Sequence, residues 1–203
     1  DLKITGGIIT VDAVNDGIKG KDSVAIRDGT ITITAGGDGI QSTNDEDTEK
    51  GYVAIEGGTL DITSGTDGIQ AETVVEISGG DISITSGGGS ANGSSGNNWG
   101  NWGTTTTNTD EESAKGIKSA NAVIISGGTL DIDSSDDSVH SNNAITVLGG
   151  ILLLASGDDG MHSDSTMQID AGQITITKSY EGLESATIII NGGDMDITAS
   201  DDG

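Results

Sequence analysis

The residues of this sequence with the clearest potential for chemistry are carboxylates that recur at one position. In each repeat the position lies directly before an anchor residue, usually glycine, and its occupants are Asp16, Asp38, Asp67, Lys115, Asp137, Asp159, Glu181 and Asp202. Three repeats carry a second aspartate just before it, namely Asp136, Asp158 and Asp201. Calcium takes about six to eight oxygen ligands from carboxylates, carbonyls and water, so these corners indicate calcium chemistry.

Electrostatics supports a cation at these corners, although a turn role is the simpler explanation for any single aspartate. Carboxylates stacked about 5 Å apart repel by roughly 1 kcal/mol in water, and by more in a less polar setting. Aspartate also favours Asp-Gly turns because its side chain bonds the local backbone. We therefore predict calcium as the cofactor first at the paired corners, Asp136-Asp137, Asp158-Asp159 and Asp201-Asp202. The further candidate ligands are Glu181, Asp16, Asp38 and Asp67.

Two histidines occupy equivalent positions on adjacent repeats. His140 and His162 each stand two residues past the anchor. Two such histidines do not make a zinc site without further ligands. We expect them to be polar residues on one face of the molecule.

The chain has few lysines, and three of them stand in or near the acidic positions of the repeats. Lys115 takes the aspartate position of its own repeat, and Lys118 follows it closely. Lys178 precedes Tyr180 in the segment KSYEGLES. Charge compensation is the simpler role for the lysines, and contact with a sugar carboxylate or service as a catalytic base is the alternative. These four residues are candidate carbohydrate contacts.

A repeat of about 22 residues must position all of these groups. The second residue of a recurrent pair marks it, at Gly7, Gly29, Gly58, Gly80, Gly128, Gly150, Gly172 and Gly193. Within one repeat Val24 and Ile26 precede the pair, while Ile31 and Ile33 follow it. Apolar residues spaced by two predict strands with one buried face. Repeats of this length predict a solenoid, so we expect an all-β, right-handed parallel β-helix of about eight coils.

Two insertions interrupt the period within what we expect to be a single domain over residues 1–203. The first covers about 41–50 and is acidic, and the second covers about 86–113 and is rich in glycine, serine, asparagine and threonine. Insertions in solenoids are usually loops on one face and often carry binding residues. The second contains Trp99 and Trp102, which are candidates for stacking on a sugar ring.

Composition excludes several classes of function. The chain has 33 acidic and 8 basic residues, which gives a formal net charge of −25. Its long-range field repels nucleic acid, so we predict no nucleic-acid partner. No apolar run approaches the length of a membrane helix, so we predict no membrane insertion. The absence of cysteine excludes thiolate metal sites and disulfides.

Four segments, taken with the anchors, resemble one known family in their order and spacing. They are SAKGIKS (113–119), SSDDSVHS (134–141), SGDDGMHSD (156–164) and KSYEGLES (178–185). The sequence resembles the bacterial carbohydrate-binding-domain family of right-handed parallel β-helix proteins, and the resemblance covers nearly the whole chain. It implies an extracellular protein, secreted or attached to the bacterial cell surface, that binds calcium and pectin or cellulose. It also implies a fold similar to calcium-dependent pectate lyases without established lyase activity.

The leading prediction is therefore a calcium-dependent protein that binds plant cell-wall polysaccharide and is not an enzyme. Its partner would be acidic, such as polygalacturonate, with cellulose as a second ligand. Because the chain is strongly negative, a bridging cation or local lysine contacts must overcome the repulsion. The first alternative is a calcium-dependent pectate-type lyase with Lys115 or Lys178 as the base. The second is a structural surface stalk or adhesin in which calcium only stabilises the fold.

Overall fold

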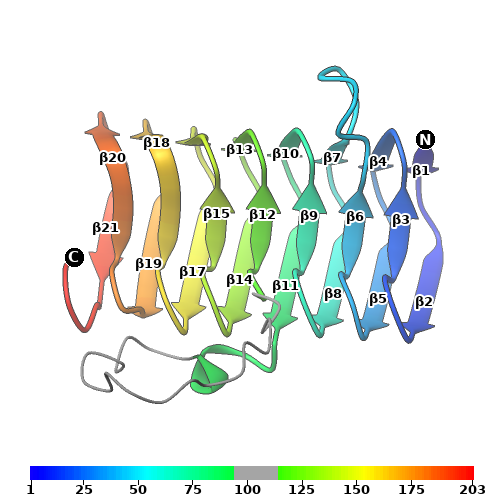
Figure 1. The fold of residues 1–203 in the computed structure, drawn as a ribbon, viewed down its shortest axis with the longest axis horizontal. Helices are drawn as coiled ribbons and strands as arrows, with labels where there is room; N and C mark the ends of the chain where they lie inside the picture. Colours follow the sequence, from blue (N-terminus) through cyan, green and yellow to red (C-terminus); the bar gives the residue numbers. More distant parts are fainter. Residues whose placement is uncertain (94–113) are drawn as a thin grey trace, which may run out of the picture.

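The computed structural model describes residues 1–93 and 114–203, which form two sheets of parallel strands. Successive repeats lie side by side in sequence order, so each repeat adds strands next to those of the previous one (Figure 1). The one helix among the described residues is the short 3-10 helix η1 (Ser90–Asn92). The predicted all-β chain of parallel strands is confirmed.

The first sheet has eight strands, all parallel and in sequence order. They are β2 (Ile8–Ala13), β5 (Thr30–Ala35), β8 (Thr59–Ser64), β11 (Asp81–Ser86), β14 (Thr129–Ser134), β17 (Ile151–Ser156), β19 (Gln173–Lys178) and β21 (Asp194–Ile197). Equivalent residues of successive repeats pair directly, as in Ile84↔Ile132 and Ile132↔Leu154. This register stacks like residues on like residues along the molecule.

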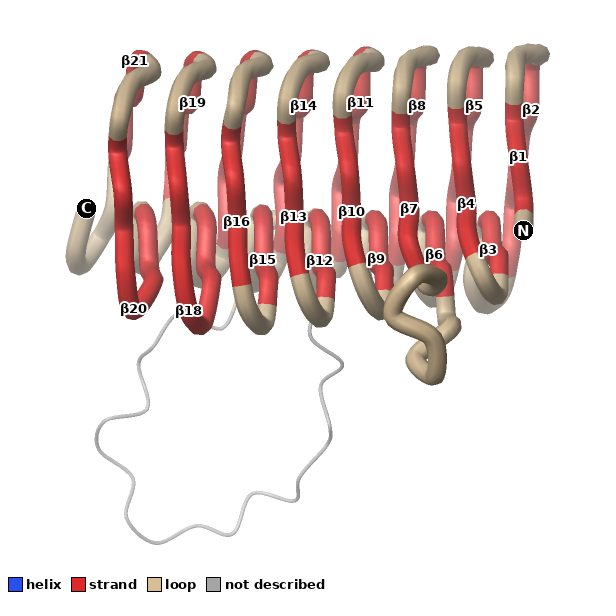
Figure 2. Tube along the Cα trace, turned by 90° about the horizontal axis from the view of Figure 1, so that it is seen from above, coloured by secondary structure: helices blue, strands red, loops and turns tan. Residues whose placement is uncertain are grey.

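The second sheet has thirteen strands in two rows that join at one end. One row is β1 (Leu2–Ile4), β4 (Ser23–Ile26), β7 (Tyr52–Ile55), β10 (Val74–Ile77), β13 (Ala122–Ile125) and β16 (Ala144–Val147). The other is β3 (Ile18–Gly20), β6 (Ile40–Ser42), β9 (Ile69–Ala71), β12 (Ile117–Ser119) and β15 (Val139–Ser141). The rows meet in the long strands β18 (Met161–Ile169) and β20 (Leu183–Ile190), as the two views show (Figures 1 and 2).

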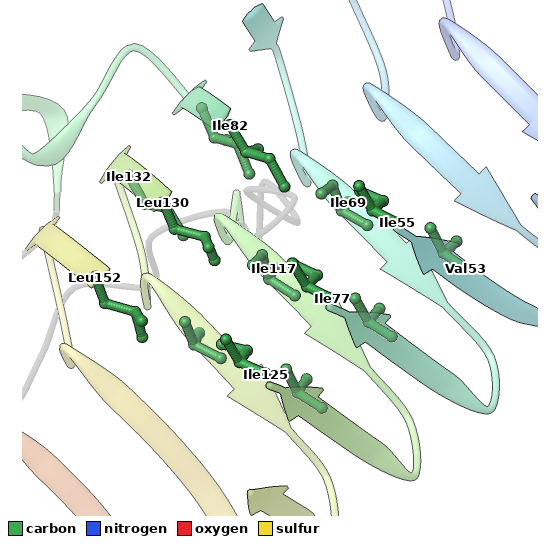
Figure 3. Close-up of a cluster of buried hydrophobic side chains, with 14 of the residues drawn as sticks. Val53, Ile55, Ile69, Ile77, Ile82, Ile117, Ile125, Leu130, Ile132 and Leu152 are labelled. Atoms are coloured by element: carbon green, nitrogen blue, oxygen red, sulfur yellow. The ribbon is translucent and has the colours of Figure 1, made fainter. Parts of the chain in front are cut away.

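The core consists of aliphatic rows that run from repeat to repeat. Val53, Ile55, Ile82 and Leu130 are at most 1% exposed, and their side chains line up with those of neighbouring strands (Figure 3). Burying one such side chain stabilises the fold by roughly 1.5–3 kcal/mol. The rows thus account for a well-packed interior in a sequence without phenylalanine.

The first predicted insertion lies between β6 and β7 and projects from the row of strands (Figure 2). Asn44 anchors it, because its side-chain amide donates to Asp22 at 2.7 Å and its oxygen accepts the backbone N–H groups of Glu46 and Asp47. Most of the second insertion, residues 94–113, lies outside the described residues. That segment holds Trp99 and Trp102, so their predicted stacking role remains a prediction.

The two recurrent glycines are required for different physical reasons. The second residue of the glycine pair has a positive φ, for example +92° at Gly128, which favours glycine. The anchor glycine instead meets its neighbours too closely for a side chain. A Cβ on Gly116 would lie 2.3 Å from Ile132 Cγ2 and 2.5 Å from the Ser138 carbonyl oxygen. Close approach, rather than left-handed backbone, explains this glycine.

One repeat replaces the anchor glycine by serine and shows how the clash is avoided. Ser138 is fully buried, and its hydroxyl lies 3.2 Å from both the Ser134 hydroxyl and the Ala155 carbonyl oxygen. The glycine anchors face isoleucines, as Gly116 faces Ile132. Leu154 is the equivalent of Ile132 one repeat later, so the register places it opposite Ser138. Leucine lacks the β-methyl group that would meet the serine Cβ. The pair Ser138–Leu154 thus replaces the usual pair of glycine and isoleucine.

We predict that Leu154→Ile destabilises the protein by about 1–3 kcal/mol, because the new β-methyl overpacks against Ser138. In the background of Ser138→Gly the same substitution should cost less than about 1.5 kcal/mol, the usual range for volume-conserving swaps. The measurement is urea unfolding of the four members of this cycle. Leu152→Ile, in the same strand, is the matched control, and an equal cost of Leu154→Ile in both backgrounds would refute the pairing.

Candidate functional site

The predicted acidic column forms a ladder of hydrogen bonds that links most repeats to the next. In it, one carboxylate oxygen accepts the backbone N–H of the equivalent residue one repeat later. The five links are Asp38 N–Asp16 Oδ1 (3.2 Å), Asp67 N–Asp38 Oδ1 (3.0 Å), Lys115 N–Asp67 Oδ1 (2.9 Å), Asp159 N–Asp137 Oδ1 (3.1 Å) and Glu181 N–Asp159 Oδ1 (3.1 Å). The aspartates of these links therefore have a structural role, but they bond the next repeat, whereas the simpler expectation was a bond within their own turn.

A second set of residues, the polar column, faces the other oxygen of these carboxylates. Each member stands three residues after the acidic position, and paired strands stack them as Lys19, Gln41, Gln70, Lys118, His140, His162 and Glu184. Lys19 bonds Asp16 at 2.8 Å, and Gln41 bonds Asp38 at 2.6 Å. Sequence reasoning singled out only Lys118 here as a site residue. The signal it missed was the constant spacing of three within each repeat.

An open groove of about 530 Å³ lies over the acidic column in the N-terminal half. Its lining is mainly polar and comprises Asn15, Asp16, Gly36, Gly37, Asp38, Thr66, Asp67, Gln70 and Lys118. Burial is the main cause that raises the pKa values of Asp38 and Asp67. The ammonium group of Lys118, which lies 3.2 Å from Asp67 Oδ2, acts in the opposite direction on both pKa values. The groove offers closely spaced donors and acceptors, the groups that bind sugar hydroxyls.

Lys115 provides an internal cation for one of the paired acidic corners. Its Nζ lies 2.9 Å from both Asp136 Oδ2 and Asp137 Oδ2, and its side chain is only 11% exposed. Burial acts to lower the pKa of Lys115, but Asp137 and Asp136 outweigh it and raise the pKa. For Asp137, His140 and Lys115 overcome the effect of burial and lower the pKa to about 2. The ammonium group thus stands where a bound cation was expected.

The next repeat has more carboxylates than donors to pair with them. His162 Nδ1 lies 3.1 Å from Glu184 Oε2, 3.3 Å from Asp159 Oδ2 and 4.0 Å from Asp137 Oδ2. Burial, and then the hydrogen bond with Glu184, raises the pKa of Asp159 to about 8. The two histidine rings lie 5.0 Å apart. They belong to a dense group of carboxylates, and Glu184 is a member that sequence reasoning did not identify.

A further group, here called the acidic corner, comprises Asp158, Glu181, Asp201 and Asp202 at the C-terminal repeats. Partial burial, and then repulsion from Asp137 and Asp136, raises the pKa of Asp158. Partial burial, followed by Glu184, Asp202 and Asp201, raises the pKa of Glu181. Of these four, only Asp158 joins a described group with three ligand atoms within 4.8 Å of one another, together with Asp136 and Asp137. The acidic corner therefore concentrates charge without forming a closed cage.

The remaining candidate carbohydrate contacts lie at the same end of the molecule. Lys178 Nζ donates to the carbonyl oxygen of Ser90 and so ties β19 to η1. Tyr180 is half-buried, and its backbone N–H donates to the Asp158 carbonyl oxygen at 2.6 Å. A hydrogen bond to Asp201, and then the charge of that carboxylate, raises the pKa of Tyr180. Neither residue lines the N-terminal groove.

Comparison with known proteins assigns the family. The model of a family described as "Carbohydrate-binding domain-containing protein" matches residues 1–160 and 158–203. The chain belongs to this family. No curated protein and no solved structure matches it. Membership of this carbohydrate-binding family favours a polysaccharide partner and a binding protein rather than an enzyme. Within the described ranges, no helix is both long enough and apolar enough to span a membrane.

In this family member, we predict that Lys115→Met destabilises the fold by about 3–5 kcal/mol, because it leaves the buried Asp137 and the half-buried Asp136 without their ammonium partner. Urea unfolding at neutral pH measures the loss. Lys50→Met is the matched control, since Lys50 is 45% exposed and lies 3.5 Å from Asp47 and 3.7 Å from Asp22. Such an exposed pair contributes at most about 1 kcal/mol. Similar losses in both variants would contradict a special role for Lys115.

Proposed function

We propose that this chain is a non-catalytic, calcium-dependent domain that binds plant cell-wall polysaccharide outside the cell. Acidic chains such as polygalacturonate are the first candidates, and cellulose is the second. The observation that carries the proposal is the match of a carbohydrate-binding family over essentially the whole chain. The placement outside the cell, secreted or at the bacterial surface, is part of this proposal.

We infer that the two sheets belong to a right-handed parallel β-helix of about eight coils. Support comes from the way in which repeats place equivalent residues in register across both sheets. Equivalent side chains then recur at the strand spacing of about 4.8 Å. A regular polymer lying along the molecule would meet a similar polar group at each step, which suits a polysaccharide better than a small ligand.

The N-terminal groove is our candidate for contacts with sugar hydroxyls. Asn15, Gln70 and Lys118 line it and provide amide and ammonium donors next to carboxylate acceptors. Such pairs match a sugar hydroxyl, which both donates and accepts a hydrogen bond. The groove carries several carboxylates of its own, so neutral glycans such as cellulose suit it better than acidic ones.

The acidic corner is our candidate for calcium. Its four carboxylates supply only oxygen ligands, which a hard cation such as calcium prefers. The raised pKa values of Asp158 and Glu181 are consistent with charge that has too little compensation. A calcium ion held there could also accept a carboxylate of polygalacturonate, which a chain of net charge −25 otherwise repels.

A lyase remains the alternative function, but the two lysines considered as its base are poorly suited to the task. The pKa of Lys115 is raised, which keeps its ammonium protonated, whereas a general base must be deprotonated near the working pH. Lys178 donates to a backbone carbonyl. Release of an unsaturated product from polygalacturonate, measured by its ultraviolet absorbance, would support the lyase function instead.

We expect the double substitution Asp201→Asn with Asp202→Asn to weaken calcium-dependent binding to polygalacturonate by at least about tenfold, or about 1.4 kcal/mol. Binding to cellulose should not change, because the N-terminal groove is untouched. Isothermal titration with polygalacturonate and pull-down on cellulose, each with calcium and with chelator, measure this.

Asp194→Asn with Asp196→Asn is the matched control, since both residues are exposed in β21 and the change in charge is identical. Equal effects of the two double variants would refute the calcium site. Absence of binding to every plant polysaccharide with calcium present would refute the function, and chelation that only lowers the melting temperature would favour the structural stalk.

A further inference from the structure

The imidazole of His162 faces more negative charge than it can satisfy. Its Nδ1 has carboxylate oxygens of Glu184 at 3.1 Å, Asp159 at 3.3 Å and Asp137 at 4.0 Å. A neutral imidazole nitrogen donates at most one hydrogen bond, and even a charged ring offers one proton at this atom. Asp159 is only 4% exposed, so water compensates its charge poorly. A divalent ion among these atoms would remove the repulsion.

We propose that Asp159, His162 and Glu184 form a binding site for a divalent transition metal ion, with Zn²⁺ as the reference ion. Asp159 Oδ2, His162 Nδ1 and Glu184 Oε2 come from two adjacent repeats. The ligand atoms of this trio all lie within 4.8 Å of one another. Zinc bonds to nitrogen and oxygen measure about 2.0–2.2 Å, which places tetrahedral ligands about 3.3–3.6 Å apart. The distances of 3.1 Å from Nδ1 to Glu184 Oε2 and of 3.3 Å to Asp159 Oδ2 are close to this distance between ligands.

Neighbouring groups already hold these ligands in place by hydrogen bonds, as groups around metal ligands commonly do. Asp164 Oδ1 lies 3.4 Å from His162 Nε2, so this carboxylate can hold the proton on Nε2 and leave Nδ1 free to bind a metal. The other oxygen of Asp159 accepts the Glu181 backbone N–H at 3.1 Å. The pairing of carboxylate, histidine and metal is a recurrent arrangement around zinc.

The ligand set distinguishes this site from the calcium proposed at the acidic corner. Calcium takes oxygen ligands, whereas imidazole nitrogen suits zinc and its transition-metal neighbours. Three protein ligands leave a fourth position open, which is the pattern of zinc sites that also bind water or substrate. The side chain of Glu184 is 45% exposed and that of His162 is 26% exposed, so the open position can reach solvent. This inference stands independently of the proposed carbohydrate binding.

The test is titration of the whole chain with Zn²⁺ alone, without polysaccharide, followed by isothermal calorimetry. A chain of net charge −25 attracts any cation, so about 0.15 M salt and an excess of calcium should be present to screen and saturate the oxygen sites. We expect one zinc ion to bind in spite of the calcium. With Co²⁺ as the probe, we expect the strong visible absorption of a tetrahedral ion.

Variants assign the ligands. His162→Gln and Glu184→Gln should each weaken zinc binding by at least about 100-fold, and Asp164→Asn by about 10–100-fold. His140→Gln is the matched control, because its ring nitrogens bond Asp137 at 2.8 Å and Asn142 at 2.9 Å. Circular dichroism should show that all variants keep the fold.

Three results would overturn the proposal. The first is no zinc binding in the presence of calcium, and the second is unchanged binding in His162→Gln, which would indicate nonspecific attraction to a negative chain. The third is an equal loss in His140→Gln, which would move the site to Asp137 and the two histidines. Loss of polysaccharide binding in these variants is not part of the test, so the two proposals fail separately.

Discussion

The register of the repeats is the constraint on which the rest of this structure depends. Parallel pairing places each residue beside its equivalents in the repeats before and after it. For isoleucine and leucine this builds continuous buried rows, and the rows stabilise the fold. For aspartate it places like charges about one strand spacing apart, where they repel. A sequence with 33 acidic residues must therefore compensate charge at every repeat.

Compensation changes in kind along the polar column. At the N-terminal end Lys19 and Gln41 donate to the carboxylate three residues before them. In the middle, Lys118 faces Asp67 and Lys115 sits between two carboxylates. Toward the C-terminal end the column continues as His140, His162 and finally Glu184. The number of hydrogen-bond donors on the side chain therefore falls along the column: ammonium and amide groups come first, imidazole groups follow, and the carboxylate of Glu184 has no donor when ionised. Uncompensated charge therefore gathers at that end, which is where we propose that cations bind.

Much of this follows from the sequence because period and residue type determine it. The period predicted the parallel strands, the buried rows and the stacking of the acidic positions. The hydrogen bonds between the acidic column and the polar column were not predictable in the same way. The conformation of the turn decides which carboxylate oxygen accepts a backbone N–H and which one bonds the polar column. The need for glycine at the anchor was not predictable from the period either, because the close contacts of Gly116 with the neighbouring repeat decide it. The proximity of His162 to Glu184 follows from the same period, because each stands three residues after an acidic position, but sequence reasoning did not use that spacing.

The side-by-side arrangement of the repeats also explains how such an imbalance of charge is tolerated. In repeat structures each unit contacts only its neighbours, so stability is roughly a sum of local contributions. A repulsive corner then weakens the repeats that contain it without loosening distant ones. Leu154 and Ile176 lie beneath the crowded corners and are at most 1% exposed, so the aliphatic rows continue unbroken there. Packing inside the molecule is thus separate from charge at its surface. That separation allows one end to hold excess carboxylates while the carboxylates of the other end stay internally paired.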